Sequence, residues 1–385
     1  MSLADLTHLS RARAAAEVLG PLAARIEAER RLPAEALRAL VDAGVFKLVV
    51  PRSLGGSEAS LPTLLAVLEE IACADGSAGW CAMVGTTSSL MSVFLDDDVA
   101  REVFAAHDAI TCGVFAPMGR ATPVSGGYRV SGRWAFASGC EHASWRMGGA
   151  LVSTDGGSAP GHPPEVRSML FRDRDTRVID TWNTSGLRGT GSHDFEVSDV
   201  FVPDARSFSL LADKPRNAGP TYALPFFGVL AASVASVALG IARGAIDTFV
   251  LLAKKKHPLG AKRSIAQREL VQLHVAQAEG KVRAARAFLR AAVAEAEVEA
   301  ASGGGVSLTT RALLRLAASH AASEAAAAVD LVYNAGGASS IYASSPLQRQ
   351  FRDVHVATQH IMVSSTATIL AGRILLGVES DVSML

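Results

Sequence analysis

A run of eleven residues near the middle of the chain combines the side chains that could bind a flat aromatic anion. The run Trp182–Ser192 reads WNTSGLRGTGS and holds an indole, a guanidinium, several hydroxyls and three glycines. Glycine lets the backbone approach a ligand without a clash at Cβ. Trp182, Arg188, Thr190 and Ser192 are therefore candidate ligand-binding residues. A tight turn with a structural arginine explains the run equally well when it is taken alone.

A second hydroxyl follows an apolar segment that reads WAFASG from Trp134 to Gly139. A serine at the end of a strand, here Ser138, can donate a hydrogen bond to a ring nitrogen or accept one from it. Trp134 and Trp182 could both contact a cofactor. The alternatives are a serine in an ordinary turn and tryptophans that belong to the core, and these alternatives stay open for each residue taken singly.

Two histidines close to the C-terminus could act as a general acid or base near neutral pH. His355 and His360 lie in a segment that is expected to be helical. On one helix, at roughly 100° per residue, they would point about 140° apart, so a shared metal ion is not expected. His142 is a weaker candidate, four residues after Ser138. For each of them, a hydrogen-bonded structural histidine is the alternative.

Composition excludes several functional classes. The 385 residues contain 37 Lys and Arg and 37 Asp and Glu, so no net charge attracts nucleic acid or an anionic membrane. Cys73, Cys81, Cys112 and Cys140 form no CxxC pair, which argues against structural zinc and favours a reduced, cytoplasmic setting. The N-terminus lacks the basic and apolar regions of a signal peptide. The motifs GxxxxGK[ST], GxSxG, HExxH and GxGxxG are also absent.

One uncharged stretch, Tyr222–Ala242, approaches the length of about 20 residues that a membrane span requires. It is rich in Ala, Ser and Gly, and it contains Pro225. A helix that is buried on all sides within a soluble bundle explains this composition better than a membrane span does. We therefore expect no membrane association.

These candidate residues must be positioned by three successive regions, which together predict an α+β fold. Residues 1–110 have helical patterns, residues 111–215 form a small β-barrel or sandwich domain, and residues 216–385 form a four-helix bundle. Gly126-Gly127 is typical of a hairpin, and Asp155–Pro164 is typical of an exposed loop. The predicted strands are Thr111–Phe115, Tyr128–Val130, Arg133–Ala137, Met147–Ser153, Arg167–Phe171 and Phe195–Val202. The predicted bundle helices are Leu224–Lys256, Ser264–Ala301, Ser307–Tyr333 and Pro346–Leu376.

Taken together, these features resemble the acyl-CoA dehydrogenase superfamily over nearly the whole chain. The segment from GLRGTGS to VFVP at Pro203 resembles its middle-domain signature, and Gly336-Gly337 with Arg352-Asp353 resembles its C-terminal signature. The resemblance implies a flavin between the β domain and the bundle, with Gly336 and Gly337 near its adenine–pyrophosphate end, and a homotetramer. Lys256 stands where many relatives have an arginine, which removes a bidentate contact to the pyrophosphate.

Dehydrogenation of an acyl-CoA requires a carboxylate that removes the α-proton. By the resemblance, the position of the family's glutamate falls on Ile361. The sequence has no acid from Val354 to Val378 and none from Thr221 to Ile246. Dehydrogenase chemistry therefore lacks its base in this chain.

The presence of His360 next to Ile361 makes this chain resemble instead the flavin-dependent monooxygenase branch of the superfamily. That branch implies reduced flavin, FMN or FAD, supplied by a separate reductase. The flavin would react with O2 to a C4a-(hydro)peroxyflavin that oxidises a small organic substrate. Ser138 would bond flavin N5, and His360 would deprotonate the substrate or stabilise the peroxide, with His355 as the second candidate. Two alternatives stay open: an acyl-CoA dehydrogenase with an unlocated base, and a flavin-binding relative without catalysis.

Overall fold

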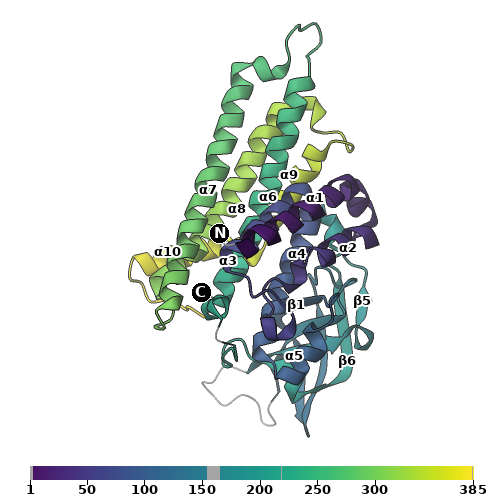
Figure 1. Cartoon of the computed structure of the whole chain (residues 1–385), viewed down its shortest axis with the longest axis vertical. Helices are drawn as coiled ribbons and strands as arrows, with labels where there is room; N and C mark the ends of the chain where they lie inside the picture. The colour runs from purple at the N-terminus through teal and green to yellow at the C-terminus, as the bar shows by residue number, and fades with distance from the viewer. Residues whose placement is uncertain (1–2, 154–164, 218, 384) are drawn as a thin grey trace.

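The computed structural model describes residues 3–153, 165–217, 219–383 and 385, so the predicted loop Asp155–Pro164 lies outside the described residues. Helices come first, a sheet follows, and a long helical bundle ends the chain (Figure 1). This order confirms the predicted α+β class. The boundaries drawn at residues 110 and 215 stay predictions.

The N-terminal helices pack between the bundle and the sheet. They are α1 (Leu3–Glu29), α2 (Ala34–Asp42), α3 (Leu61–Ala74), α4 (Gly76–Ser89) and α5 (Asp97–Phe104), with short 3-10 turns η1 (Val45–Lys47) and η3 (Leu90–Phe94). Nearly every residue of α4 is buried. It begins where the Asp75 carboxylate accepts a hydrogen bond from the Ala78 amide at 2.8 Å, because an N-cap acceptor satisfies an otherwise unpaired amide.

The strands of the described residues form a single seven-stranded sheet of order β5-β6-β2-β1-β3-β4-β7, where the sequence allowed a barrel or a sandwich. Only β1 and β3 pair in parallel within it. The predicted hairpin joins β1 to β2, with Gly126 at φ 77°. The strands are β1 (Thr111–Val124), β2 (Gly127–Trp134), β3 (Trp145–Val152), β4 (Val166–Arg172), β5 (Arg177–Ile179), β6 (Asp194–Pro203) and β7 (Ser207–Phe208).

The predicted strand Arg133–Ala137 is wrong beyond its first two residues. Strand β2 ends at Trp134, and Phe136 adopts a left-handed backbone with φ 64°. A bulky side chain at positive φ cannot continue a strand. The chain therefore turns there and carries Ser138 away from the sheet.

The bundle is built from α6 (Phe226–Lys255), α7 (Glu269–Ala301), α8 (Leu308–Gly336), α9 (Pro346–Ala357) and α10 (Ser365–Leu375). The predicted single helix Pro346–Leu376 is wrong, because the chain breaks between α9 and α10 at a 3-10 turn, η10 (Ile361–Val363). His360 has an extended backbone there, and its ring accepts a hydrogen bond from the Met362 amide, as an N-cap does. His360 therefore lies in a break, not on the helix of His355.

Helix α6 is long and apolar enough to cross a membrane by length and composition, but 94% of its most apolar window is buried inside the protein. It packs against both α8 and α3. This burial confirms the interpretation of Tyr222–Ala242 as part of a core helix.

Candidate active site

A chain of buried hydroxyls runs from helix α4 into the loop before β6. The Trp80 indole Nε1 donates to Ser138 Oγ at 3.0 Å, and Ser138 Oγ lies 2.7 Å from Ser192 Oγ. Ser192 Oγ in turn lies 2.7 Å from Thr190 Oγ1, which donates to the Leu187 carbonyl at 2.7 Å. The structure therefore brings together three of the predicted residues, although they come from two separate loops.

His360 packs against Trp80, with ring centroids 5.5 Å apart in an edge-to-face arrangement. Its Nδ1 accepts from the Met362 amide at 3.3 Å, so the ring proton belongs on Nε2. Burial, together with the positive charge of Arg315, lowers the pKa of His360 to about 4. The ring is therefore neutral at physiological pH and can accept a proton only when a stronger acid approaches.

His355 has different neighbours. Its Nε2 lies 2.9 Å from Asp330 Oδ1, its ring packs edge-on against Phe351 at 4.5 Å, and 41% of its side chain is exposed. An accessible ion-pairing histidine of this kind is a common surface feature. The structure thus separates the two histidines by environment as well as by element.

Phe136 is a site residue that sequence reasoning missed. Its side chain is 73% exposed, and its ring meets that of Trp182 edge-on at 6.2 Å. The Trp182 indole donates to the Leu187 carbonyl at 3.0 Å, which ties this aromatic pair to the hydroxyl chain. An exposed phenylalanine at positive φ two residues before Ser138 is unusual. The only sequence feature that could have identified Phe136 as a site residue is its place in the segment WAFASG.

Two predicted residues lie outside this group. Trp134 is fully buried in the core of the sheet, where its ring stacks on Phe195 at 4.9 Å and its Nε1 donates to the Gly149 carbonyl at 2.8 Å. Arg188 reaches back to the Thr184 carbonyl of its own loop at 3.4 Å. The observed contacts of both residues are structural.

Lys256, Gly336 and Gly337 form a second group at the ends of α6 and α8. Lys256 Nζ donates to the Gly336 carbonyl at 2.8 Å. Gly337 has φ 55° and ψ −142°, a backbone that side chains avoid. An ammonium beside an open glycine turn can hold an anionic group.

Two buried carboxylates near the loop were also missed. Asp353 Oδ1 accepts from the Leu187 amide at 2.6 Å, and Asp75 caps α4. Burial raises the pKa of Asp353 to about 7 and that of Asp75 to about 6. Both face backbone amides, whereas Ile361, at the position of the dehydrogenase base, is aliphatic and 66% exposed. The Arg352-Asp353 pair was the available sequence signal for this contact.

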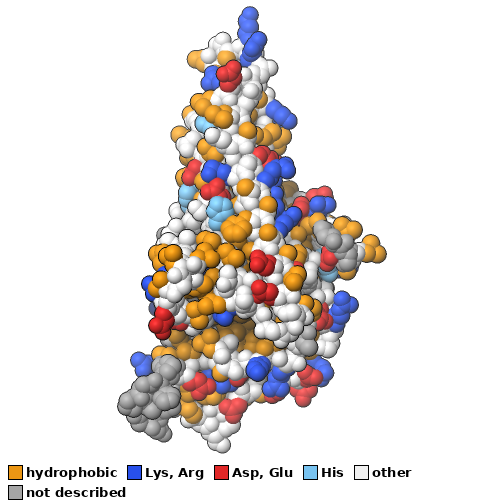
Figure 2. All heavy atoms as spheres, turned by 90° about the vertical axis from the view of Figure 1, so that its left-hand side faces the viewer, with side chains coloured by type: hydrophobic (Ala, Val, Ile, Leu, Met, Phe, Trp, Pro, Cys, Tyr) orange, Lys and Arg blue, Asp and Glu red, His pale blue; other side chains and the backbone are white. Residues whose placement is uncertain are grey.

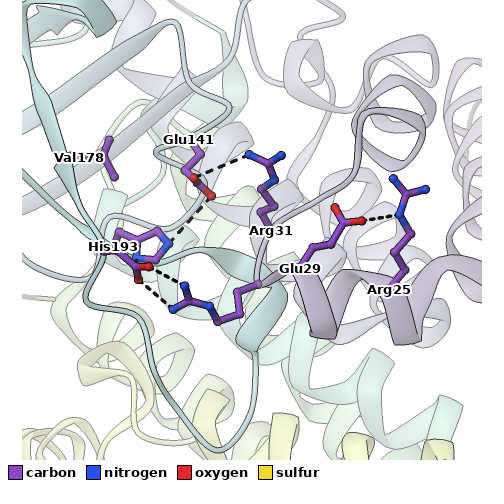
Figure 3. Close-up of a pocket in the computed structure, with 8 residues that line it drawn as sticks. Arg25, Glu29, Arg31, Glu141, Val178 and His193 are labelled. Carbon is purple, nitrogen blue, oxygen red and sulfur yellow. Dashed lines mark hydrogen bonds and ion pairs between the residues drawn. The ribbon is translucent and has the colours of Figure 1, made fainter.

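The outer side of the same loop faces a pocket of about 690 Å³ between the end of α1 and the sheet (Figure 3). Figure 3 shows Glu141 between Arg31 and His193. His193 Nδ1 accepts from the amides of Thr181 and Trp182, both at 3.1 Å. Three arginines and three acids line the pocket, so their charges balance. The residues of its walls hold the loop before β6 in place, and they do not attract an ion of one charge.

The residues present fit a flavin. An aromatic pair, exposed Phe136 and half-buried Trp182, lies beside a row of hydroxyls that can bond ring nitrogens and oxygens. Lys256 and the glycine turn offer a separate place for phosphate. The aromatic pair with its hydroxyls and the separate phosphate site both match the flavin site that the sequence predicts.

Comparisons with known proteins agree with this geometry. Residues 8–97 match the N-terminal domain of acyl-CoA dehydrogenases, and residues 232–365 match their C-terminal domain. An indole-3-acetate monooxygenase of Pseudomonas putida is 32% identical over 352 residues, which cover 91% of this chain and 88% of that protein. The chain belongs to the flavin-dependent monooxygenases of the acyl-CoA dehydrogenase family.

Further relatives align over almost their whole length. The oxygenase component of an FADH2-dependent resorcinol hydroxylase from Rhizobium sp. is 31% identical over 94% of this chain and 92% of its own. The solved structure of XiaF from Streptomyces sp., in complex with FADH2 and glycerol, has a TM-score of 0.90 and 28% identity, covering 98% and 97% of the two chains. The names of both relatives thus include reduced flavin, FADH2.

Proposed function

We propose that this protein is the oxygenase component of a two-component system, which receives reduced flavin from a separate reductase and oxidises a small organic molecule. The observation that carries the proposal is the group of buried Ser138 and Trp80 with half-buried His360, next to Ile361 in place of a base. Bound reduced flavin supplies the two electrons with which O2 gives one oxygen atom to the substrate and the other to water.

Ser138 holds the ring edge of the flavin in this proposal. Its Oγ accepts from Trp80 and shares one hydrogen bond with Ser192, so a hydroxyl already oriented by two neighbours faces the cofactor. A preoriented donor or acceptor needs no reorganisation when charge develops during the reaction. Phe136 and Trp182 provide the apolar surface for the ring.

His360 is the proposed hydrogen-bond donor to the reacting oxygen. It is neutral at physiological pH, its Nε2–H can donate a hydrogen bond, and Trp80 and the Met362 amide fix its ring. His355 is the second candidate. Its pairing with Asp330 and its exposure favour a structural role instead.

Lys256, Gly336 and Gly337 are the proposed binding residues for the phosphate end of FMN or FAD. Lysine binds phosphate as a point charge, whereas arginine can make two parallel hydrogen bonds. The weaker contact suits a flavin that must enter reduced and leave oxidised. It also matches a cofactor delivered by diffusion.

A homotetramer in the cytoplasm completes the proposal. Figure 2 shows hydrophobic side chains gathered on the face that α7 and α10 border in Figure 1. Contiguous exposed apolar surface of this kind marks a protein interface. The four free cysteines suit a reducing compartment. Exposed apolar residues on these two helices include Leu270, Leu273, Val298, Ile369 and Leu375.

The test is a pair of stopped-flow experiments. Reduced flavin bound to the protein is mixed with O2, and oxidised flavin bound to the protein is mixed without O2 with an acyl-CoA. We expect an absorbance transient before oxidised flavin appears in the first experiment, and no bleaching in the second. Bleaching by the acyl-CoA without any transient would instead support a dehydrogenase.

A further inference from the structure

The peptide of Leu187 lies at the centre of the loop that is proposed to hold the flavin ring. Its carbonyl accepts three hydrogen bonds: from the Trp182 indole at 3.0 Å, from the Thr190 hydroxyl at 2.7 Å and from the Thr190 amide at 3.2 Å. The Thr190 hydroxyl leads on to Ser192 and Ser138. The orientation of the indole and of the hydroxyl chain therefore depends on this one carbonyl.

The backbone of Leu187 is strained. It has φ 48° and ψ 34°, the left-handed conformation that residues other than glycine rarely adopt. Such a conformation persists only where neighbouring groups hold it. The carboxyl of Asp353 supplies this hold from outside the loop, because its Oδ1 accepts a hydrogen bond from the Leu187 amide at 2.6 Å.

The backbone of α9 also lies against the loop beside Asp353. A Cβ added at Gly186 would lie 2.3 Å from the Arg352 carbonyl oxygen and 2.7 Å from the Asp353 amide nitrogen, so the two backbones approach each other closely. The Arg352 guanidinium donates to the Ser185 carbonyl and pairs with the Glu27 carboxylate of α1 at 2.6 Å. Three successive residues of the loop thus meet two successive residues of α9.

Asp353 is well placed to anchor the loop. It is 3% exposed, and its helix α9 packs against both α6 and α8 of the bundle. Burial and the nearby charge of Asp75 raise the pKa of its carboxyl to about 7. A buried acid of this kind is costly for stability, and such groups are frequent at functional sites. The contact with the loop gives a functional reason for its position.

We propose that Asp353 is a positioning residue of the flavin site. Through the Leu187 peptide, it holds Trp182 and the hydroxyl chain in the orientation that contacts the ring. The proposal rests on the proposed function, because it takes this loop as one wall of the flavin site. Asp353 acts only through its acceptor atom, so a variant that retains an acceptor there should retain the function.

Three variants test this role. Asp353→Ala removes the acceptor for the Leu187 amide, whereas Asp353→Asn keeps one in its amide oxygen. Gly186→Ala leaves Asp353 in place but introduces the Cβ that clashes with the Arg352 carbonyl, so the loop must move away from α9. If Asp353→Ala does not fold, Gly186→Ala still displaces the loop.

The first readout is the fluorescence of Trp182 in the flavin-free protein. Asp353→Ala and Gly186→Ala should shift the emission to longer wavelength, because the indole loses its fixed acceptor and meets more water. The shift should vanish in a Trp182→Phe background, and Asp353→Asn should emit as the wild type does. Unchanged emission in the folded variants would overturn the proposal.

The second readout is the affinity for oxidised riboflavin, which has the flavin ring without the phosphate. Asp353→Ala and Gly186→Ala should bind riboflavin about tenfold more weakly, which corresponds to roughly 1.4 kcal/mol. Asp353→Asn should bind it as tightly as the wild type does. Fluorescence titration measures each affinity.

Ser307→Ala is the control for general stability. It removes an acceptor of the Thr310 amide at the start of α8, so it should lower the melting temperature but leave riboflavin affinity unchanged. Equal losses of affinity in Ser307→Ala and Asp353→Ala would overturn the proposal. A wild type that binds riboflavin but gives no absorbance transient with O2 would contradict the proposed function instead.

Discussion

The Ser138 group and the Lys256 group differ in how they are built. Ser138, Trp80 and His360 come from the loop after β2, an N-terminal helix and a break in the bundle; Ser138 and Trp80 are buried, and His360 is half-buried. Lys256 and Gly336 come from the adjoining ends of two bundle helices, and Lys256 remains partly accessible. Oxygen chemistry requires exclusion of water, whereas phosphate binding requires only access and positive charge. On this comparison we propose that the first group serves the reaction and the second retains the cofactor.

The largest effect is expected at His360. His360→Ala should lower the rate of substrate oxidation by about 10²–10³-fold, because a positioned hydrogen-bond donor to the reacting oxygen is lost. The rate of peroxide release should rise as the rate of product formation falls. Both rates are measured in one oxygen-uptake assay. His355→Ala is the matched control and should change little. A stronger loss in His355→Ala would reverse the assignment of the two histidines.

Ser138→Ala should lower the rate of substrate oxidation by about 10²-fold, as for loss of one preoriented hydrogen bond. It also leaves the buried Trp80 indole without its acceptor, which should reduce the free energy of unfolding by about 1–3 kcal/mol. Steady-state kinetics and urea unfolding measure the two effects. Ser131→Ala, at an exposed serine of β2, is the control. Full activity in Ser138→Ala would remove Ser138 from the site.

A smaller effect is expected at Lys256, in the second group of the comparison. Lys256→Arg should strengthen binding of FAD by about tenfold, because a guanidinium can contact pyrophosphate with two hydrogen bonds. Binding of FMN should change less, and the rate of substrate oxidation should not rise. Fluorescence titration with each flavin gives both affinities, with Lys255→Arg as the control. Equal gains for FAD and FMN would argue against a pyrophosphate contact.

The fourth prediction concerns stability. Burial raises the pKa of the Asp353 carboxyl from 3.8 to about 7. Protonated Asp353 therefore contributes to the free energy of unfolding at pH values below the unfolded pKa, and this contribution is lost as the pH rises towards 7. Asp353→Asn removes the ionisation and can keep the acceptor for the Leu187 amide. Its free energy of unfolding relative to wild type should therefore increase by roughly 1–3 kcal/mol between about pH 4 and pH 8.

Urea unfolding at several pH values measures this difference. Asp381→Asn, at an exposed carboxylate with its own hydrogen bond to Ser383, is the control and should show no such rise. A constant difference between Asp353→Asn and wild type across the pH range would show that Asp353 folds in its charged form.

Much of this arrangement could be predicted from local pattern. The order of helices and strands, the hairpin at Gly126 and the buried helix around Tyr222–Ala242 all follow from periodicity and composition. The run Trp182–Ser192 and Ser138 were identified by their hydroxyls and glycines. These features depend on neighbours in sequence, which is why they are visible without a structure.

The remainder depends on contacts between distant residues or on backbone geometry. Trp80 meets Ser138 across 58 positions, and Asp353 meets Leu187 across 166. The left-handed turn at Phe136 and the break at His360 arise from residues that are compatible with a strand or a helix, until tertiary contacts select another conformation. Burial also changes the acid–base character of His360, which the sequence leaves at its ordinary value.

The most direct test of the central claim uses reduced flavin bound to the wild-type protein, mixed rapidly with O2 and followed by absorbance at several pH values. We predict a transient species before oxidised flavin, longer lived than in free solution, because the group around Ser138 and His360 excludes water. Direct conversion to oxidised flavin at every pH, at the rate of free flavin, would contradict the account.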